Sequence, residues 1–291
     1  MYFTGRYNNL LYFITGTTGS GKSLLAHELA LKHSLKILSL DSMAIYKNLD
    51  ILSAKPTKSM REEVEYFGLD IVEENTNFSV FDYLSYLSDI QLDKISHKED
   101  ILVVGGTGLY FNAVVGKYSF RKIDNSYRDQ LEALSLESLQ EIYSNNHPNK
   151  TSVDLKNKRR LIRAIESNNE IEYNNMLDFK LPNKNIGVFW DNPDYMENIH
   201  NRTHNMIRNG LADEIRHLDS PSRTIQQAIG YKEVLSINDE ANLISEINKK
   251  TYKLVKKQRT WFKKIKNLIY LHTDSENKIL STLGGLSNGR L

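Results

Sequence analysis

Residues 10–23 read LLYFITGTTGSGKS, and this stretch decides the fold. Its first part, Leu10–Thr15, is a short apolar run rich in aromatic residues, which is typical of a buried strand. The loop Gly16–Ser23 fits the pattern G-x-x-x-x-G-K-[S/T], and helical spacing of apolar residues follows over Lys22–His33. A glycine-rich loop between a strand and a helix is the setting in which this pattern indicates phosphate binding.

We expect each kind of residue in this loop to contribute differently to polyphosphate binding. Glycines let the backbone approach phosphate oxygens, and successive N–H groups form an anion nest at the helix amino terminus. Lys22 would neutralise the terminal phosphate, and the Ser23 hydroxyl would reach Mg²⁺. The alternative is a turn that merely joins strand to helix, which the strand and helix on either side disfavour.

Two further apolar runs predict more strands of the same sheet. These are Lys36–Leu40 and Ile101–Val104, and the segment between them, Val80–Ile95, has helical periodicity. Strands that alternate with helices indicate an α/β domain with a P-loop-type core and a largely parallel sheet. Ligands of such sheets bind beyond the carboxyl ends of the strands.

The character of the sequence changes after about Val115. Residues 118–183 are charged, rich in asparagine and helical in pattern, which predicts a helical insertion domain. The core then comprises residues 1–117 and 184–291, and it resumes with a strand at Asn185–Trp190. Later segments are predicted as helices over 194–209, 211–218, 222–236 and 241–266, with a last strand at Leu268–His272.

Composition limits the possible classes of protein. The 291 residues carry a formal net charge of only +2, so any nucleic-acid partner must be recognised by local clusters of charge. The chain contains no cysteine, which excludes disulfides and thiolate metal sites and is compatible with the reducing cytoplasm. No apolar run is long enough to span a bilayer, so we expect no membrane partner.

Asp41 follows the strand Lys36–Leu40 and is therefore expected at its carboxyl end, near the phosphate loop. A carboxylate there could accept a proton or order Mg²⁺ through water, and the alternative is a helix cap or turn residue. The later strand runs into Gly105-Gly106-Thr107-Gly108 without an acidic residue. Kinases and NTPases usually need an acidic metal ligand there, so this pattern weakens those assignments.

The order of several motifs resembles the tRNA dimethylallyltransferase family. The segment after Asp41 reads DSMAIYKNLDI and is followed by Ala54-Lys55-Pro56. The remaining matches, which extend the resemblance over roughly residues 10–266, are GGTGLY at 105–110, RLIRAIE at 160–166, Gly210-Leu211, GYKE at 230–233 and KKQRTWF at 256–262.

This resemblance implies transfer of a dimethylallyl group from dimethylallyl diphosphate to the N6 amine of the adenosine immediately 3′ of the tRNA anticodon. It implies Asp41 as the base on the amine, with Thr107 beside the reacting atoms and Mg²⁺ as cofactor. The residues implied for diphosphate are Gly16, Thr17, Thr18, Gly19, Ser20, Gly21, Lys22, Ser23, Lys257 and Lys263. Those implied for tRNA are Ser42, Lys55, Arg160, Arg163 and Gln258. The family commonly has arginine at the positions of Lys257 and Lys263, and lysine lacks its bidentate fork.

Residues 249–266 contain nine basic residues and no acidic one. Lys249, Lys253 and Lys256 share one face of the predicted helix, which indicates contact with a nucleic-acid backbone. The alternative is a solvated helix face.

Other functions remain open from the residues alone. They are an adenylate prenyltransferase acting on free AMP, ADP or ATP, a P-loop small-molecule kinase and a non-catalytic RNA-binding module. We expect the protein to act as a monomer.

Overall fold

The structure is a computed structural model, and it describes residues 10–96, 101–115, 125–146, 153–166, 184–266 and 268–287. Two compact units are present, one formed by residues 1–118 with 179–291 and the other by residues 119–178. The corresponding boundaries in the sequence prediction were 118 and 183. Within the described residues, no helix is long and apolar enough to cross a membrane.

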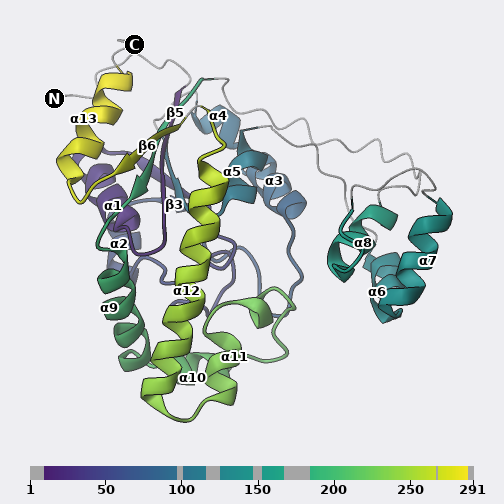
Figure 1. Ribbon diagram of the computed structural model, residues 1–291. Helices are drawn as coiled ribbons and strands as arrows, with labels where there is room; N and C mark the ends of the chain where they lie inside the picture. The colour runs from purple at the N-terminus through teal and green to yellow at the C-terminus, as the bar shows by residue number, and fades with distance from the viewer. Residues whose placement is uncertain are drawn as a thin grey trace. The chain divides into compact units, whose positions relative to one another are not determined.

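A six-stranded parallel sheet forms the centre of the first unit (Figure 1). Its order is β3-β2-β4-β1-β5-β6, and all its paired strands run parallel. This confirms the predicted α/β fold. The strands are β1 (Leu10–Gly16), β2 (Lys36–Ser39), β3 (Tyr66–Phe67), β4 (Ile101–Gly105), β5 (Lys184–Asp191) and β6 (Leu268–His272).

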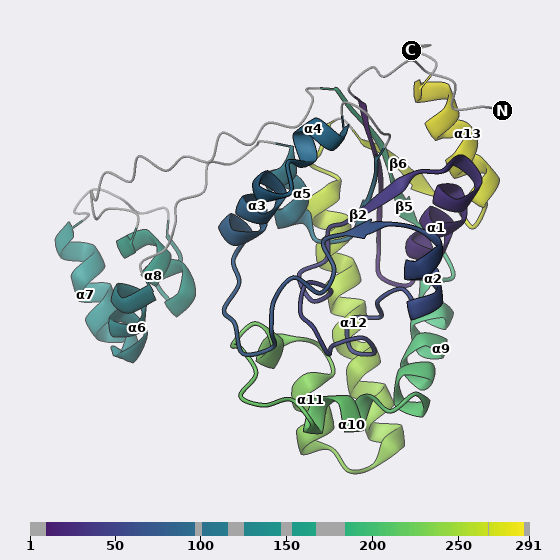
Figure 2. The same cartoon turned by 180° about the vertical axis from the view of Figure 1, so that it is seen from behind.

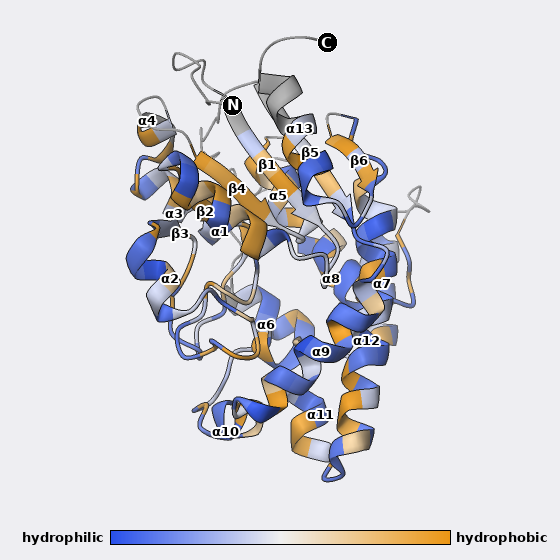
Figure 3. Cartoon of the chain, turned by 90° about the vertical axis from the view of Figure 1, so that its left-hand side faces the viewer, coloured by the Kyte–Doolittle hydropathy of each residue, from blue (hydrophilic) through white to orange (hydrophobic). Residues whose placement is uncertain are grey.

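Alternating side chains of the strands fill two apolar layers. Tyr12 and Ile14 pack in one cluster with residues of helix α1 (Lys22–His33) and with Ile279 of α13 (Glu276–Ser287). Phe13, between them, points to the opposite face and meets Phe111 of α5 (Gly108–Val114) at a ring separation of 5.0 Å. Figure 3 shows the central strands as hydrophobic, as burial on both faces requires.

The helical run predicted over Val80–Ile95 is interrupted. It forms α3 (Val80–Asp89) and α4 (Leu92–Ser96), and Gln91 between them has a positive φ of 53° that ends the first helix. Ser79 begins α3 through a reciprocal capping box with Asp82. A short helix not predicted from the sequence, α2 (Lys58–Glu63), precedes β3.

The helices between β5 and β6 form the lower part of the first unit in Figure 2. They are α9 (Tyr195–Arg208), α10 (Leu211–Arg216), the 3₁₀ turn η1 (Ile225–Gln227), α11 (Tyr231–Ser236) and α12 (Glu240–Phe262). Helix α12 runs from this lower part up to the sheet. The helix predicted over 241–266 ends at Phe262, so Lys264 and Lys266 lie beyond it. The helix predicted over 222–236 is divided by Gly230, whose φ of 108° is incompatible with a helix.

The second unit contains three helices among its described residues, α6 (Asn125–Ala133), α7 (Leu136–Asn146) and α8 (Lys158–Glu166). Its own small core includes Leu131, Leu139, Leu161 and Ile165. An ion pair between Arg128 and Glu166 joins α6 to α8.

Candidate active site

A cavity of about 830 Å³ lies in the first unit, and the carboxyl ends of the adjacent strands β2, β4 and β1 open into it. Asp41 and Ser42 follow β2, Thr107 follows β4, and the phosphate loop follows β1. Helices α9 and α12 supply the opposite wall. Residues from three neighbouring strand ends are therefore brought to one space, as the parallel sheet predicts.

Only some residues of the phosphate loop line this cavity. Residues 18–23 line it, and Gly19 and Gly21 adopt φ values of 82° and 94°. Gly16 is the last residue of β1, and the Thr17 N–H donates to the Trp190 carbonyl at 3.1 Å. Gly16 and Thr17, both predicted to bind diphosphate, are not among the residues that line the cavity, and the Thr17 amide is bonded to β5.

Side chains from the end of β5 and from α9 brace the loop. The Asn192 amide donates to the Ser20 carbonyl at 3.2 Å, and the Asn198 amide donates to the Gly19 carbonyl at 2.9 Å. Arg202, one turn after Asn198, also lines the cavity. Sequence reasoning missed these residues, because polar side chains four apart in a helix are common and their meaning depends on the sheet beside them.

Lys22 and Arg202 place two cations at the cavity. The Lys22 ammonium donates to the Thr17 carbonyl at 3.2 Å. Burial, first, and the Arg202 guanidinium, second, lower the pKa of Lys22 to about 8, while Asp41 opposes the shift. Burial also lowers the pKa of Arg202, again with Asp41 opposing. The pair is costly to desolvate without an anion, so the site is suited to bind one.

Diphosphate binding should therefore weaken as the pH rises above about 8. Below that value Lys22 already carries its proton, whereas above it the amine must take up a proton to meet the anion. The diphosphate itself stays ionised there, since the second pKa of a phosphate group is about 6. Calorimetry of a non-reactive diphosphate analogue, in buffers of different protonation enthalpy, should show uptake of about one proton at about pH 9 and far less at about pH 7. Equal proton uptake at both pH values would contradict this.

Asp41 is held by the backbone that follows it. Its Oδ1 accepts the N–H of Met43 at 2.8 Å and that of Ala44 at 3.4 Å. These bonds leave Oδ2 as the oxygen that can accept a proton from a ligand in the cavity. The turn role that sequence analysis raised as an alternative is thus compatible with a chemical one. Thr107, the residue immediately before α5, lines the same cavity.

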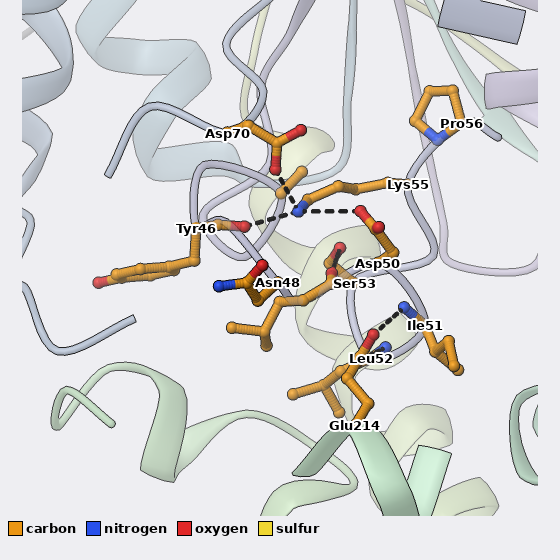
Figure 4. Close-up of polar contacts among 12 residues, drawn as sticks. Tyr46, Asn48, Asp50, Ile51, Leu52, Ser53, Lys55, Pro56, Asp70 and Glu214 are labelled. Carbon is orange, nitrogen blue, oxygen red and sulfur yellow. Dashed lines mark hydrogen bonds and ion pairs between the residues drawn. The ribbon is translucent and has the colours of Figure 1, made fainter. Parts of the chain in front are cut away.

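Lys55 was expected to bind tRNA, but its ammonium is buried inside the protein (Figure 4). It donates to the Tyr46 carbonyl and to the Asp70 carboxylate, both at 2.6 Å, and lies 3.2 Å from Asp50. Arg61 pairs with the same two carboxylates at 2.6 and 3.0 Å. The two cations and two anions compensate each other and support the loop after Asp41. Contact of Lys55 with tRNA stays a prediction.

Glu214 of α10 anchors the same loop from below (Figure 4). Its two carboxylate oxygens accept the N–H groups of Ile51 and Leu52, each at 2.7 Å. Leu52 and the residues after it, up to Pro56, line the cavity. A wall of the candidate site is therefore attached to α10 by charge-assisted hydrogen bonds.

The basic residues of α12 and its end occupy different environments. Lys257 lines the cavity, whereas the Lys263 ammonium lies 5.5 Å from the centre of the Tyr270 ring and is not among the lining residues. Two lysines of the basic segment 249–266 form ion pairs with acidic residues outside it. Lys249 pairs with Glu246 at 2.9 Å, and Lys250 pairs with Glu233. Lys253 and Lys256 are exposed.

Gln258, which was expected to contact tRNA, lines the cavity, but the residue is only 8% exposed and its side chain bonds within the protein. Its Oε1 accepts the Thr18 N–H at 2.9 Å, and its Nε2 donates to the Gly106 carbonyl at 3.1 Å. Both ends of the amide are therefore used by the two glycine-rich loops. Contact of Gln258 with tRNA stays a prediction. Ser42 lines the cavity as expected for a substrate contact.

Arg160 and Arg163 lie on α8 of the second unit, and both are exposed. Burial and the neighbouring Arg159 lower the pKa of Arg163. Glu166, the acid nearest in sequence, is taken by Arg128 through two hydrogen bonds. Their exposure keeps the two arginines available for an anionic partner.

Together, the fold and the site define an α/β enzyme with a P-loop-type core, in which residues 18–23 of the glycine-rich loop and Asp41 line one cavity. Residues 44–265 match the protein family described as IPP transferase. The chain belongs to that family, which confirms the resemblance found in the sequence.

Curated relatives extend along most of the chain. A tRNA dimethylallyltransferase of Finegoldia magna is 34% identical over 89% of this chain and 90% of its own length. One of Leuconostoc mesenteroides is 33% identical over 90% of this chain and 93% of its own length.

Solved structures agree with this placement. A tRNA isopentenylpyrophosphate transferase from Bacillus halodurans has a TM-score of 0.68 and 26% identity, covering 97% of this chain and 96% of that one. A eukaryotic dimethylallyltransferase acting on tRNA has a TM-score of 0.74 at 20% identity, with 96% and 77% of the two chains covered. The latter supports the fold alone.

Proposed function

We propose that the protein transfers a dimethylallyl group from dimethylallyl diphosphate to the N6 amine of the adenosine immediately 3′ of the tRNA anticodon. The observation that carries this proposal is that the phosphate loop, Arg202 and Asp41 face one cavity. A phosphate cradle opposite a carboxylate suits a reaction in which a diphosphate leaves while a nucleophile loses a proton. The tRNA-modifying relatives supply the class of acceptor.

In this reaction the bond from the allylic carbon to the diphosphate oxygen breaks, and a bond from that carbon to N6 forms. The diphosphate leaves with the electron pair, and Asp41 Oδ2 takes the proton of the amine. Lys22, Arg202 and the phosphate loop stabilise the negative charge that collects on the leaving group. The apolar lining, including Ile199 and Met206, keeps water from the allylic carbon.

The donor set also suits Mg²⁺, which prefers oxygen ligands and keeps part of its water shell. Ser23, in the first turn of α1, lines the cavity, and its hydroxyl would hold the ion together with diphosphate oxygens. When bound, Mg²⁺ would neutralise charge on the diphosphate.

We further propose that one chain is the working unit, since the ends of β1, β2 and β4 and the helices α9 and α12 of the same chain line the cavity. The absence of cysteine suits the cytoplasm, where the acceptor tRNA is found.

The test is incubation of the protein with radiolabelled dimethylallyl diphosphate and one acceptor at a time, either unmodified tRNA, AMP, ADP or ATP. We expect label in tRNA, released by digestion as a modified adenosine. Label in the free nucleotides instead would indicate an adenylate prenyltransferase. Phosphate transfer from ATP to a small molecule, without label in any acceptor, would indicate a kinase.

The exposed lysines of α12 should control the salt dependence of tRNA binding. Changing Lys249, Lys253 and Lys256 to glutamine should weaken binding and flatten the plot of log affinity against log salt by about 0.7 to 0.9 for each phosphate that is no longer neutralised. The weak surface pair of Lys249 with Glu246 does not prevent such an interaction. Filter binding at several salt concentrations measures the slope. The matched control is Lys278→Gln, an exposed lysine of α13, which should leave it unchanged. An unchanged slope in the triple variant would indicate a solvated face.

A further inference from the structure

We propose that Gln258 and Trp261 are positioning residues that hold Thr107 at a set distance from the phosphate loop. This inference rests on the proposed function. One face of α12 connects two loops. The first is the phosphate loop after β1, which would bind the leaving group, and the second is the glycine-rich loop after β4, which would lie beside the nucleophile.

The Gln258 amide is a direct link between the two loops. The Thr18 N–H can only donate, and the Gly106 carbonyl can only accept, so the two ends of the amide are assigned by their partners. Nε2 also lies 3.5 Å from Thr18 Oγ1. One buried side chain therefore bonds to the loop after β1 and to the loop after β4.

The second glycine-rich loop is shaped to receive α12. A Cβ atom at Gly106 would lie 2.6 Å from Gln258 Nε2 and 2.9 Å from the Gly16 carbonyl oxygen. A Cβ atom at Gly108 would lie 2.2 Å from Trp261 Cδ1, and its three nearest neighbours all belong to that ring. Gln258 and Trp261 are three residues apart, so they share a helix face. Thr107 therefore lies between two contacts with α12, that of Gly106 with Gln258 and that of Gly108 with Trp261.

Neighbouring contacts fix the rotation of α12 about its axis. The Arg259 Nε lies 2.9 and 3.0 Å from the two oxygens of Asp191, the residue that ends β5. Phe262 packs against Phe111 of α5 and Phe189 of β5, at ring separations of 5.6 and 4.8 Å. The amide of Gln258 is therefore presented from a helix that is locked to the sheet and to α5.

The consequence for the reaction is geometric. The diphosphate lies in the first loop, and Thr107 lies beside the acceptor, so the Gln258 bridge sets the separation of the two reacting ends. A misplacement of about 1 Å can cost about 10²-fold in rate. Loss of the bridge should slow the transfer step without removing any group that holds tRNA.

The test compares Gln258→Met in two backgrounds, the wild-type chain and Thr107→Val. Methionine keeps the size of the side chain but removes both hydrogen bonds. At saturating tRNA and dimethylallyl diphosphate, we expect the single-turnover rate to fall about 10- to 10²-fold in the wild-type background. In the Thr107→Val background, Gln258→Met should lower the rate by less than about threefold. The Thr107 hydroxyl that Gln258 positions is already absent there. The dissociation constant for tRNA should change little in either background.

Two results would overturn the proposal. One is an equal fold-loss in both backgrounds, which would make Gln258 independent of Thr107. The other is weakened tRNA binding with an unchanged rate at saturation, which would make Gln258 a tRNA contact. Should Gln258→Met fail to fold, Gln258→Glu takes its place in the same comparison. A glutamate oxygen can still accept the Thr18 N–H, but the other oxygen repels the Gly106 carbonyl. Transfer by the wild-type chain tests the proposed function separately, and its absence would overturn both proposals.

Discussion

Replacing Asp41 by asparagine should slow the transfer step by a factor of about 10² to 10⁴, the range expected for loss of a general base. Asparagine keeps an oxygen that can accept the N–H groups of Met43 and Ala44, so the turn after β2 is preserved. What is lost is the capacity to take a proton from the aromatic amine, which is a poor nucleophile while it retains that proton.

Single-turnover kinetics at saturating substrates measure this effect apart from binding. The affinity for tRNA should be retained, since the substitution leaves every basic residue in place. Asp219→Asn, at an exposed position after α10, is the matched control and should react at the wild-type rate. A rate within a few-fold of wild type for Asp41→Asn would remove Asp41 from the chemistry.

Removing either cation of the cavity should have the largest effect on diphosphate binding. Truncating one partner of a buried charge pair typically costs about 2 to 5 kcal/mol, so Lys22→Met and Arg202→Met should each weaken binding of a non-reactive analogue by about 30- to 4,000-fold. Arg208→Met changes an exposed arginine of the same helix as Arg202, α9, and should leave the affinity unchanged. Calorimetry of the analogue supplies all three dissociation constants.

The two variants differ in their pH dependence. Arg202 lowers the pKa of Lys22, so its loss should move the onset of pH dependence above about 8. Loss of Lys22 should abolish that dependence altogether. A common pH profile for both variants would contradict an electrostatic interaction between these residues at the site.

The sequence by itself determined the parts of the fold that depend on neighbouring residues. Leu10–Gly16, the phosphate loop and Lys22–His33 lie where periodicity and glycine spacing placed them. The same holds for β4 and β6, because apolar runs bounded by glycine or polar residues specify a buried strand locally. Asp41 could be placed at the cavity because the carboxyl ends of parallel strands meet at one edge. The place of Thr107 was implied by the family resemblance.

Tertiary structure alone decided which charges and amides remain available to a ligand. Lys55 follows the family pattern, yet its ammonium is taken by Asp50 and Asp70. Gln258 lies in a basic, solvent-facing helix, yet it points inward between two loops. Arg202 has no distinguishing motif, yet it shares the cavity with Lys22. A hydrogen bond or ion pair depends on side chains that are far apart in sequence, so the pattern along the chain states which groups exist, and only the packed fold determines which of them are already paired.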